Sequence, residues 1–170
     1  MNFYLMRHGL AVSGDEAGIG TDSERPLSPK GIKQMRRAAK GLARLEIPFS
    51  ALLTSPLIRA RQTAGIVAEA LGLESELEEI SGLAPESSVE HLLFGLTRFQ
   101  HRDHILLVGH QPLLSETASY LVCGKSGVSL ALPFRKGGLC RIEIDALPPT
   151  SPGTLHWLLT PKQLRLISSK

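Results

Sequence analysis

The chain contains 170 residues, of which 42% are hydrophobic and 21% are charged, and its formal net charge is +3. A length of about 100 to 200 residues is typical of one domain, so we expect a single domain over residues 1–170. No segment approaches the roughly 18 consecutive apolar residues that a membrane span needs. The N-terminus opens directly into an apolar run, with neither a basic region nor a cleavage site. These features argue against a membrane protein and favour a cytoplasmic location.

The basic residues do not follow a pattern typical of nucleic-acid binding. They are spread along the chain without interleaved aromatic residues. The densest run, over residues 30–44, falls mostly opposite the apolar positions of one predicted helix. A solvated helix face explains this run, with attraction to an acidic protein surface as the alternative.

The first part of the chain predicts a strand, a loop and a helix. An apolar run over residues 3–7 predicts the strand, and a loop containing Gly and Asp follows over residues 10–27. Ser28 then offers a capping hydroxyl before Pro29, and apolar residues at helical spacing predict a helix up to Leu45.

The same order returns further along the chain. Residues 51–54 read as a short strand, Ser55 and Pro56 as another cap and first turn, and residues 57–71 as an amphipathic helix that Gly72 closes. The remaining predicted elements are a weak strand at 77–80, a helix at 89–99, a strand at 104–108, a helix at 113–122, an alternating strand after 137–138 and a strand at 154–160.

This order of elements predicts an α/β fold. Strands that alternate with helices favour a parallel sheet covered on both faces, whereas the alternating strand after residue 138 is typical of an antiparallel or mixed edge. We therefore expect a three-layer α/β/α sandwich with a mostly parallel central sheet and an antiparallel edge strand.

Two histidines, His8 and His110, each follow a short apolar run. If both runs are buried parallel strands, their carboxyl ends lie at one edge of the sheet, where open α/β folds bind ligands. Arg7 would share that crevice, and Arg59, in the first turn of the helix after residue 57, would reach back over it. Helix N-termini at such junctions favour negative charge, so a phosphoryl group would meet Arg7, Arg59 and His110.

No group of residues has the spacing of a metal site. Cys123 and Cys140 read as reduced, packed thiols. His101 and His104 would pair on a metal only with further ligands, and none is nearby. The chain also lacks the Gly-Lys-Ser/Thr phosphate loop of P-loop enzymes. We therefore predict neither a metal nor a cofactor.

Three motifs in this order resemble those of the histidine phosphatase superfamily, which has the phosphoglycerate-mutase-like fold. They are LMRHG at residues 5–9, SPLIRARQTA at residues 55–64 and VGHQP at residues 108–112. The short length and the segment ERPLSPKG at residues 24–31 look most like the small phosphohistidine phosphatase branch, SixA.

The resemblance implies that His8 is the nucleophile, that Arg7, Arg59 and His110 form the phosphate pocket, and that Arg25 reaches its rim. A neutral His8 would attack phosphorus in line to give a phosphohistidine enzyme, which water then hydrolyses. The two arginines match phosphoryl oxygens with planar forks, and His110 would add a hydrogen-bond donor.

The chain departs from the pattern of the larger relatives at two places. Leu10, Ala11 and Val12 stand where those relatives carry a serine and an asparagine, as in the small branch. The usual general acid is a glutamate after the third strand, and here Glu79 and Glu86 are the only nearby candidates, without a matching motif. The acid is therefore unassigned, which favours phosphohistidine over phosphate monoesters because an imidazole is the better leaving group.

The leading hypothesis is a metal-independent phosphatase that removes phosphate from histidine on a protein, with a histidine-containing phosphotransfer domain as the expected partner. A phosphatase for small phosphate esters is the alternative among enzymes, and a non-catalytic phosphate-binding module is the alternative outside them. A mutase is disfavoured because the chain is too short for the insertions that enclose a small substrate. The sequence does not indicate whether the protein is a monomer or an oligomer.

Overall fold

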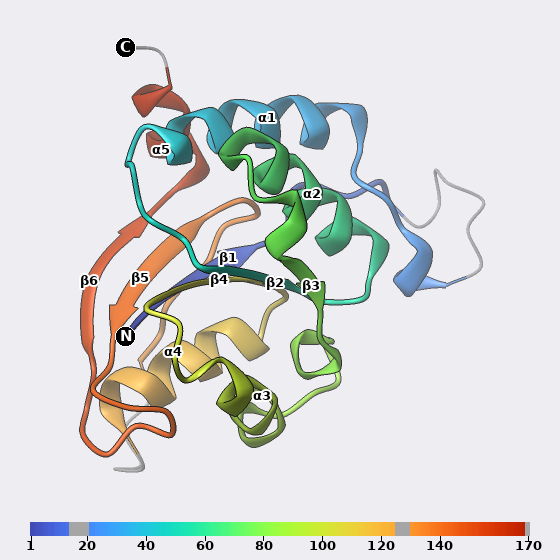
Figure 1. Ribbon diagram of the computed structural model, residues 1–170. Coiled ribbons are helices and arrows are strands. Elements are labelled where there is room, and N and C mark those ends of the chain that lie inside the picture. The colour runs from blue at the N-terminus through green and yellow to red at the C-terminus, as the bar shows by residue number, and fades with distance from the viewer. Residues whose placement is uncertain (14–20, 125–129, 169–170) are drawn as a thin grey trace.

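The computed structural model describes residues 1–13, 21–124 and 130–168. Its centre is a six-stranded sheet with the strand order β3-β2-β4-β1-β5-β6 (Figure 1). The strands are β1 (Asn2–Arg7), β2 (Ala51–Thr54), β3 (Leu77–Glu79), β4 (His104–Gly109), β5 (Leu139–Glu143) and β6 (Thr154–Leu159).

The sheet has a parallel part and an antiparallel edge. Strands β1, β4, β2 and β3 pair in parallel, whereas β5 runs antiparallel to both β1 and β6. The register of the central pair sets Arg7 opposite Gly109, so β1 and β4 end side by side. The predicted mostly parallel sheet with an antiparallel edge is confirmed.

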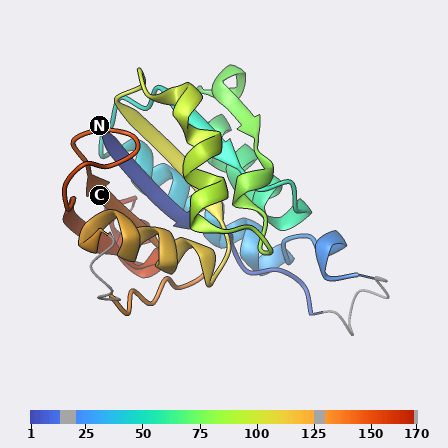
Figure 2. The same ribbon diagram turned by 90° about the horizontal axis from the view of Figure 1, so that it is seen from below.

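Helices cover both faces of the sheet. In Figure 1, α1, α2 and α5 lie on one face and α3 and α4 on the other, and Figure 2, seen from below, shows α3 and α4 in front of the strands. The helices are α1 (Pro29–Ala43), α2 (Ile58–Leu71), α3 (Val89–Leu96), α4 (Leu113–Cys123) and α5 (Pro161–Ile167). No helix in the described part of the chain is long and apolar enough to cross a membrane.

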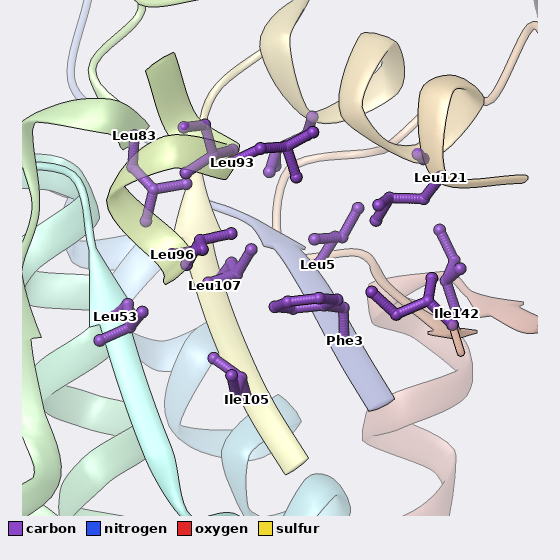
Figure 3. Packing of buried hydrophobic residues seen from close by; sticks show 14 of the residues in the cluster. Phe3, Leu5, Leu53, Leu83, Leu93, Leu96, Ile105, Leu107, Leu121 and Ile142 are labelled. Carbon is purple, nitrogen blue, oxygen red and sulfur yellow. The ribbon is translucent and has the colours of Figure 1, made fainter. Parts of the chain in front are cut away.

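The central strands are buried on both faces, which explains their continuous apolar sequence. In β1, Phe3 and Leu5 pack with the residues of α3 and α4 (Figure 3), whereas Tyr4 and Met6 pack with those of α1 and α2. All four side chains are at most 1% exposed. Burial of each side chain stabilises the fold by on the order of 1.5–3 kcal/mol. This packing holds β1, and with it the start of the segment that carries His8, in place.

Most predicted elements occur within two residues of their expected bounds. Ser28 caps α1 as predicted, since its hydroxyl oxygen accepts a hydrogen bond from the Gly31 N–H at 3.0 Å. The helix expected over 89–99 ends as an α-helix at Leu96 and continues as a 3-10 turn. Part of the loop expected over 10–27 lies outside the described residues.

One local expectation was wrong, and one helix was missed. Ser55 does not cap α2, since Leu57 occupies the N-cap position and has no side-chain capping bond. The Ser55 hydroxyl instead lies between the Leu57 N–H and His110. Helix α5 was not predicted, although Thr160 and Gln163 form a capping box around Pro161 at its start.

Candidate active site

The two histidines of the sequence motifs meet at the carboxyl ends of the central strands. His8 follows β1 and His110 follows β4, and the backbone N–H of His8 donates to the carbonyl of Gly109 at 3.0 Å. The ring centroids of the two histidines are 4.9 Å apart. Parallel pairing of β1 and β4 thus places the imidazoles together, as the sequence analysis expected.

The arginines of the motifs face the same cavity. Arg7 ends β1, and Arg59 is the second residue of α2, with a side chain only 7% exposed. The cavity has a volume of about 250 Å³. It is lined by Arg7, His8, Ala11, Asp22, Arg25, Arg59, Pro85, His110, Gln111 and Lys136. All five predicted site residues are therefore brought to one cavity.

His8 is held in one tautomer by its neighbour. Its Nδ1 lies 2.7 Å from the carbonyl oxygen of Gly9, and a carbonyl only accepts, so Nδ1 carries the proton. Burial, followed by the charges of Arg59 and Arg7, lowers the pKa of His8 to about 4, although the bond to Gly9 acts in the opposite direction. The ring is neutral at pH 7, and its Nε2 carries a free electron pair.

His110 is also neutral, and it offers a donor. Its Nε2 lies 2.8 Å from the hydroxyl oxygen of Ser55, which also accepts a 3.3 Å bond from the Leu57 N–H. When the hydroxyl donates to Nε2, the proton of the neutral ring sits on Nδ1. Burial, followed by the charges of His8 and Arg59, lowers the pKa of His110 to about 3.

Two buried nitrogens of the site have no hydrogen-bond partner within the described part of the chain: Nδ1 of His110 and Nε of Arg7. Buried donors without partners are costly, by about 1–3 kcal/mol each, unless a ligand or water completes them. Both belong to residues that line the cavity, which is where an anion would be bound.

Asp22 is a site residue that sequence analysis missed. Arg59 donates to its carbonyl oxygen at 2.5 Å and to its carboxylate at 2.8 Å, and Arg25 donates to the same carboxylate at 2.6 Å. Arg25 itself is fixed by a 2.8 Å bond from Nε to the carbonyl of Val12. The bonds from Arg25 and Arg59 lower the pKa of Asp22, so this carboxyl is ionised.

The glutamates considered as general acids lie elsewhere. Glu79 pairs with Arg61 at 2.8 Å, Glu86 is exposed, and neither lines the cavity. Asp22 is the carboxylate among the lining residues, and it is not in the acid form. The cavity therefore holds positive charge and neutral imidazoles but no protonated carboxyl group in the described residues.

The histidines considered as metal ligands do not gather a ligand set. Nδ1 of His104 lies 2.9 Å from the hydroxyl of Tyr4, and His101 is exposed. Over residues 1–13, 21–124 and 130–168, no three His, Cys, Asp or Glu side chains are grouped as a metal site would require. Cys140 is buried, which raises the pKa of its thiol to about 12, as for an unreactive packed cysteine.

Comparisons with known proteins identify the family of this chain. A sequence model of the histidine phosphatase superfamily (branch 1) matches residues 3–84. An uncharacterised protein of Picosynechococcus sp. is 37% identical over 169 residues, covering 96% of this chain and 99% of that protein. The phosphohistidine phosphatase SixA of Escherichia coli K12 is 26% identical over 168 residues, covering 98% of each. A solved structure of the protein histidine phosphatase SixA with tungstate matches with a TM-score of 0.82 at 26% identity, covering 96% of this chain and 99% of that one.

The fold, the site and these relatives define a phosphatase of the histidine phosphatase type. The chain belongs to the histidine phosphatase superfamily, and within the superfamily it matches the SixA branch.

Proposed function

We propose that this protein hydrolyses phosphohistidine on a partner protein, through a covalent phosphohistidine intermediate on His8. The observation that carries the proposal is the neutral His8 ring, which is protonated on Nδ1 and sits beside Arg7 and Arg59 in a cavity whose described lining residues include no protonated carboxyl group. Such a site has a nucleophile and phosphoryl-binding charge, but no acid for an alkoxide leaving group.

In the first step, Nε2 of His8 attacks phosphorus in line. The bond from phosphorus to the substrate imidazole breaks, and its electron pair returns to that nitrogen. The substrate reacts with its ring protonated on the other nitrogen, and this proton stays in place, so the ring leaves as neutral imidazole. Arg7 and Arg59 hold the phosphoryl oxygens, and Nδ1–H of His110 donates to one of them.

In the second step, water attacks the phosphorus of the intermediate and the bond to Nε2 of His8 breaks. The carbonyl of Gly9 keeps the proton on Nδ1 throughout, so His8 also leaves as a neutral imidazole. The protons of water remain with the inorganic phosphate. Neither step requires a carboxylic acid, and this balance supports a substrate with a phosphorus–nitrogen bond over a phosphate ester.

The relatives support the same substrate class, since the E. coli protein is a phosphohistidine phosphatase by name. We further infer that the arginines supply the charge for which other phosphatases use metal ions, so the protein acts without a metal. Its expected partner is a phosphorylated histidine-containing phosphotransfer domain, met in the cytoplasm.

The test uses a ³²P-labelled histidine phosphotransfer domain, with and without a metal chelator. We expect the protein to release phosphate in both conditions and to carry acid-labile label after rapid mixing. His8→Ala should lose the label and at least about 10³-fold in rate, as for removal of a nucleophile. His91→Ala, on the exposed face of α3, is the matched control and should keep both.

Three results would contradict the proposal. Binding of the phosphorylated domain without release would indicate a phosphate-binding module. Faster turnover of phosphate monoesters than of the labelled domain would indicate a small-molecule phosphatase. Loss of release on chelation would show that the reaction needs a metal.

A further inference from the structure

Lys136 lines the phosphoryl cavity, and none of the sequence motifs includes it. It lies in the turn that leads into β5, next to the end of β1. The residue is exposed, and it lines the cavity together with Asp22, Arg25 and Arg59.

The turn that carries Lys136 is fastened to the nucleophile's own backbone. The N–H of Gly137 donates to the carbonyls of Arg7 at 2.9 Å and His8 at 3.1 Å, and the N–H of Arg7 donates to Gly138 at 3.1 Å. The guanidinium of Arg7 also donates to the carbonyl of Phe134 at 2.9 Å. Lys136 is thus positioned by the same residues that position His8.

Glycine is required at the next position of this turn. Gly137 has φ +80°, in the left-handed region that side chains disfavour, and a Cβ there would lie 2.9 Å from Sδ of Met35. The sequence around Lys136 is therefore adapted to hold this turn against α1 and β1.

Lys136 adds a further positive charge to an already cationic cavity. Burial and the charges of Arg7, Arg25 and Arg59 lower the pKa of its ammonium, and Lys136 in turn contributes to the low pKa of His8. It forms no ion pair with any described residue. Among the described lining residues, four cations face the one carboxylate of Asp22, and a bound dianion would stabilise this arrangement.

We propose that Lys136 is a further phosphoryl-binding residue of this site, whose ammonium contacts a phosphoryl oxygen during transfer to and from His8. This proposal rests on one part of the proposed function, namely that the cavity binds a phosphoryl group. An ammonium is a compact point charge on a flexible stem, so it complements the rigid forks of Arg7 and Arg59 and can follow the oxygens as their charge grows.

The test compares Lys136→Gln with Arg135→Gln. Both changes remove one positive charge from the same turn, but Arg135 is exposed and does not line the cavity. The probe is orthovanadate, an analogue of the transferring phosphoryl group, measured by calorimetry, followed by the rate of His8 phosphorylation from the labelled domain. Circular dichroism melting confirms that each variant is folded.

We expect Lys136→Gln to weaken vanadate binding and to slow His8 phosphorylation by about tenfold or more, as for loss of one charge-assisted contact. Arg135→Gln should change either value by less than about twofold, and Lys136→Arg should recover part of the affinity. Equal losses in the two Gln variants, or none in Lys136→Gln, would overturn the proposal.

The vanadate measurement separates this inference from the proposed function. Suppose that the wild-type protein binds vanadate, that Lys136→Gln binds it more weakly, and that the wild-type protein never dephosphorylates the histidine domain. The role of Lys136 then stands and the proposed substrate fails. If wild-type protein binds no vanadate, both fail.

Discussion

At the scale of single residues, the hydrogen bonds that the two imidazoles form with the protein determine which nitrogen of each ring faces a substrate. The carbonyl of Gly9 fixes the His8 tautomer, so His8 presents an electron pair, whereas His110 presents a donor when the Ser55 hydroxyl donates to its Nε2. Both rings are neutral for the same reason, burial at the edge of a sheet beside positive charge. Nucleophile and donor are therefore distinguished by their hydrogen-bond partners and not by their charge.

Asp22 competes with anions for two arginines of the cavity. Its carboxylate engages both Arg25 and Arg59, so a phosphoryl group must share or displace these contacts. We predict that Asp22→Asn tightens orthovanadate binding by about three- to thirtyfold, because a neutral amide competes less for the guanidinium groups. Calorimetry at constant ionic strength measures this.

Glu24→Gln is the control for the Asp22 variant, since it removes an exposed negative charge in the same 3-10 turn outside the cavity lining. It should leave the affinity within about twofold. If Asp22→Asn instead weakens vanadate binding, the carboxylate serves to hold Arg59 in its binding orientation.

At the scale of elements, the sequence predicted what periodicity and strand order determine. Buried strands such as β1 and β4 show continuous apolar runs, and parallel pairing then brings His8 and His110 together. Asp22 and Lys136 could not be found in this way, because their approach depends on irregular loops and on the positive φ of Gly137. Helix α5 was missed although its capping box is local, since its seven residues carry little helical periodicity.

Contact between α1 and α5 depends on Gly41. A Cβ at this position would lie 1.9 Å from the carbonyl oxygen of Leu164, which is backbone and cannot rotate away. We predict that Gly41→Ala lowers the free energy of unfolding by about 1–3 kcal/mol through overpacking. Urea denaturation followed by circular dichroism measures the change.

Gly65, in the middle of α2, is the matched position, because no atom would lie within 4 Å of a Cβ there. Gly65→Ala should raise the free energy of unfolding by about 0.5–1 kcal/mol, the usual helical preference for alanine. Equal effects of the two substitutions would show that α5 does not pack closely on α1 in solution.

At the scale of the whole molecule, protonation of the two site histidines changes the free energy of unfolding. The two imidazoles are 6% and 2% exposed at the end of the central strands, where the surrounding charge is positive. Protonating either ring therefore costs more in the folded than in the unfolded chain. The same burial that keeps His8 nucleophilic makes the fold sensitive to mild acid.

The sign of this sensitivity follows from the pKa values. Unfolded histidine titrates near 6.5, whereas the folded pKa values of His8 and His110 are about 4 and about 3. Between these limits the unfolded chain binds more protons, so stability is full above pH 6.5 and falls as the pH drops. Between pH 7 and pH 5 we predict a loss of about 1–2 kcal/mol for each ring. This window lies above the ordinary titration range of carboxyl groups.

Urea denaturation of the wild-type protein and of His8→Gln at pH 7, 6 and 5 tests this prediction. His8→Gln should lose roughly half of the pH dependence, because one of the two buried titrating rings is gone. His91→Gln, exposed on α3, should retain all of it. A free energy of unfolding that is flat from pH 7 to pH 5 in wild-type protein would mean that these rings are not buried as neutral bases, and the low pKa of the proposed nucleophile would fail with it.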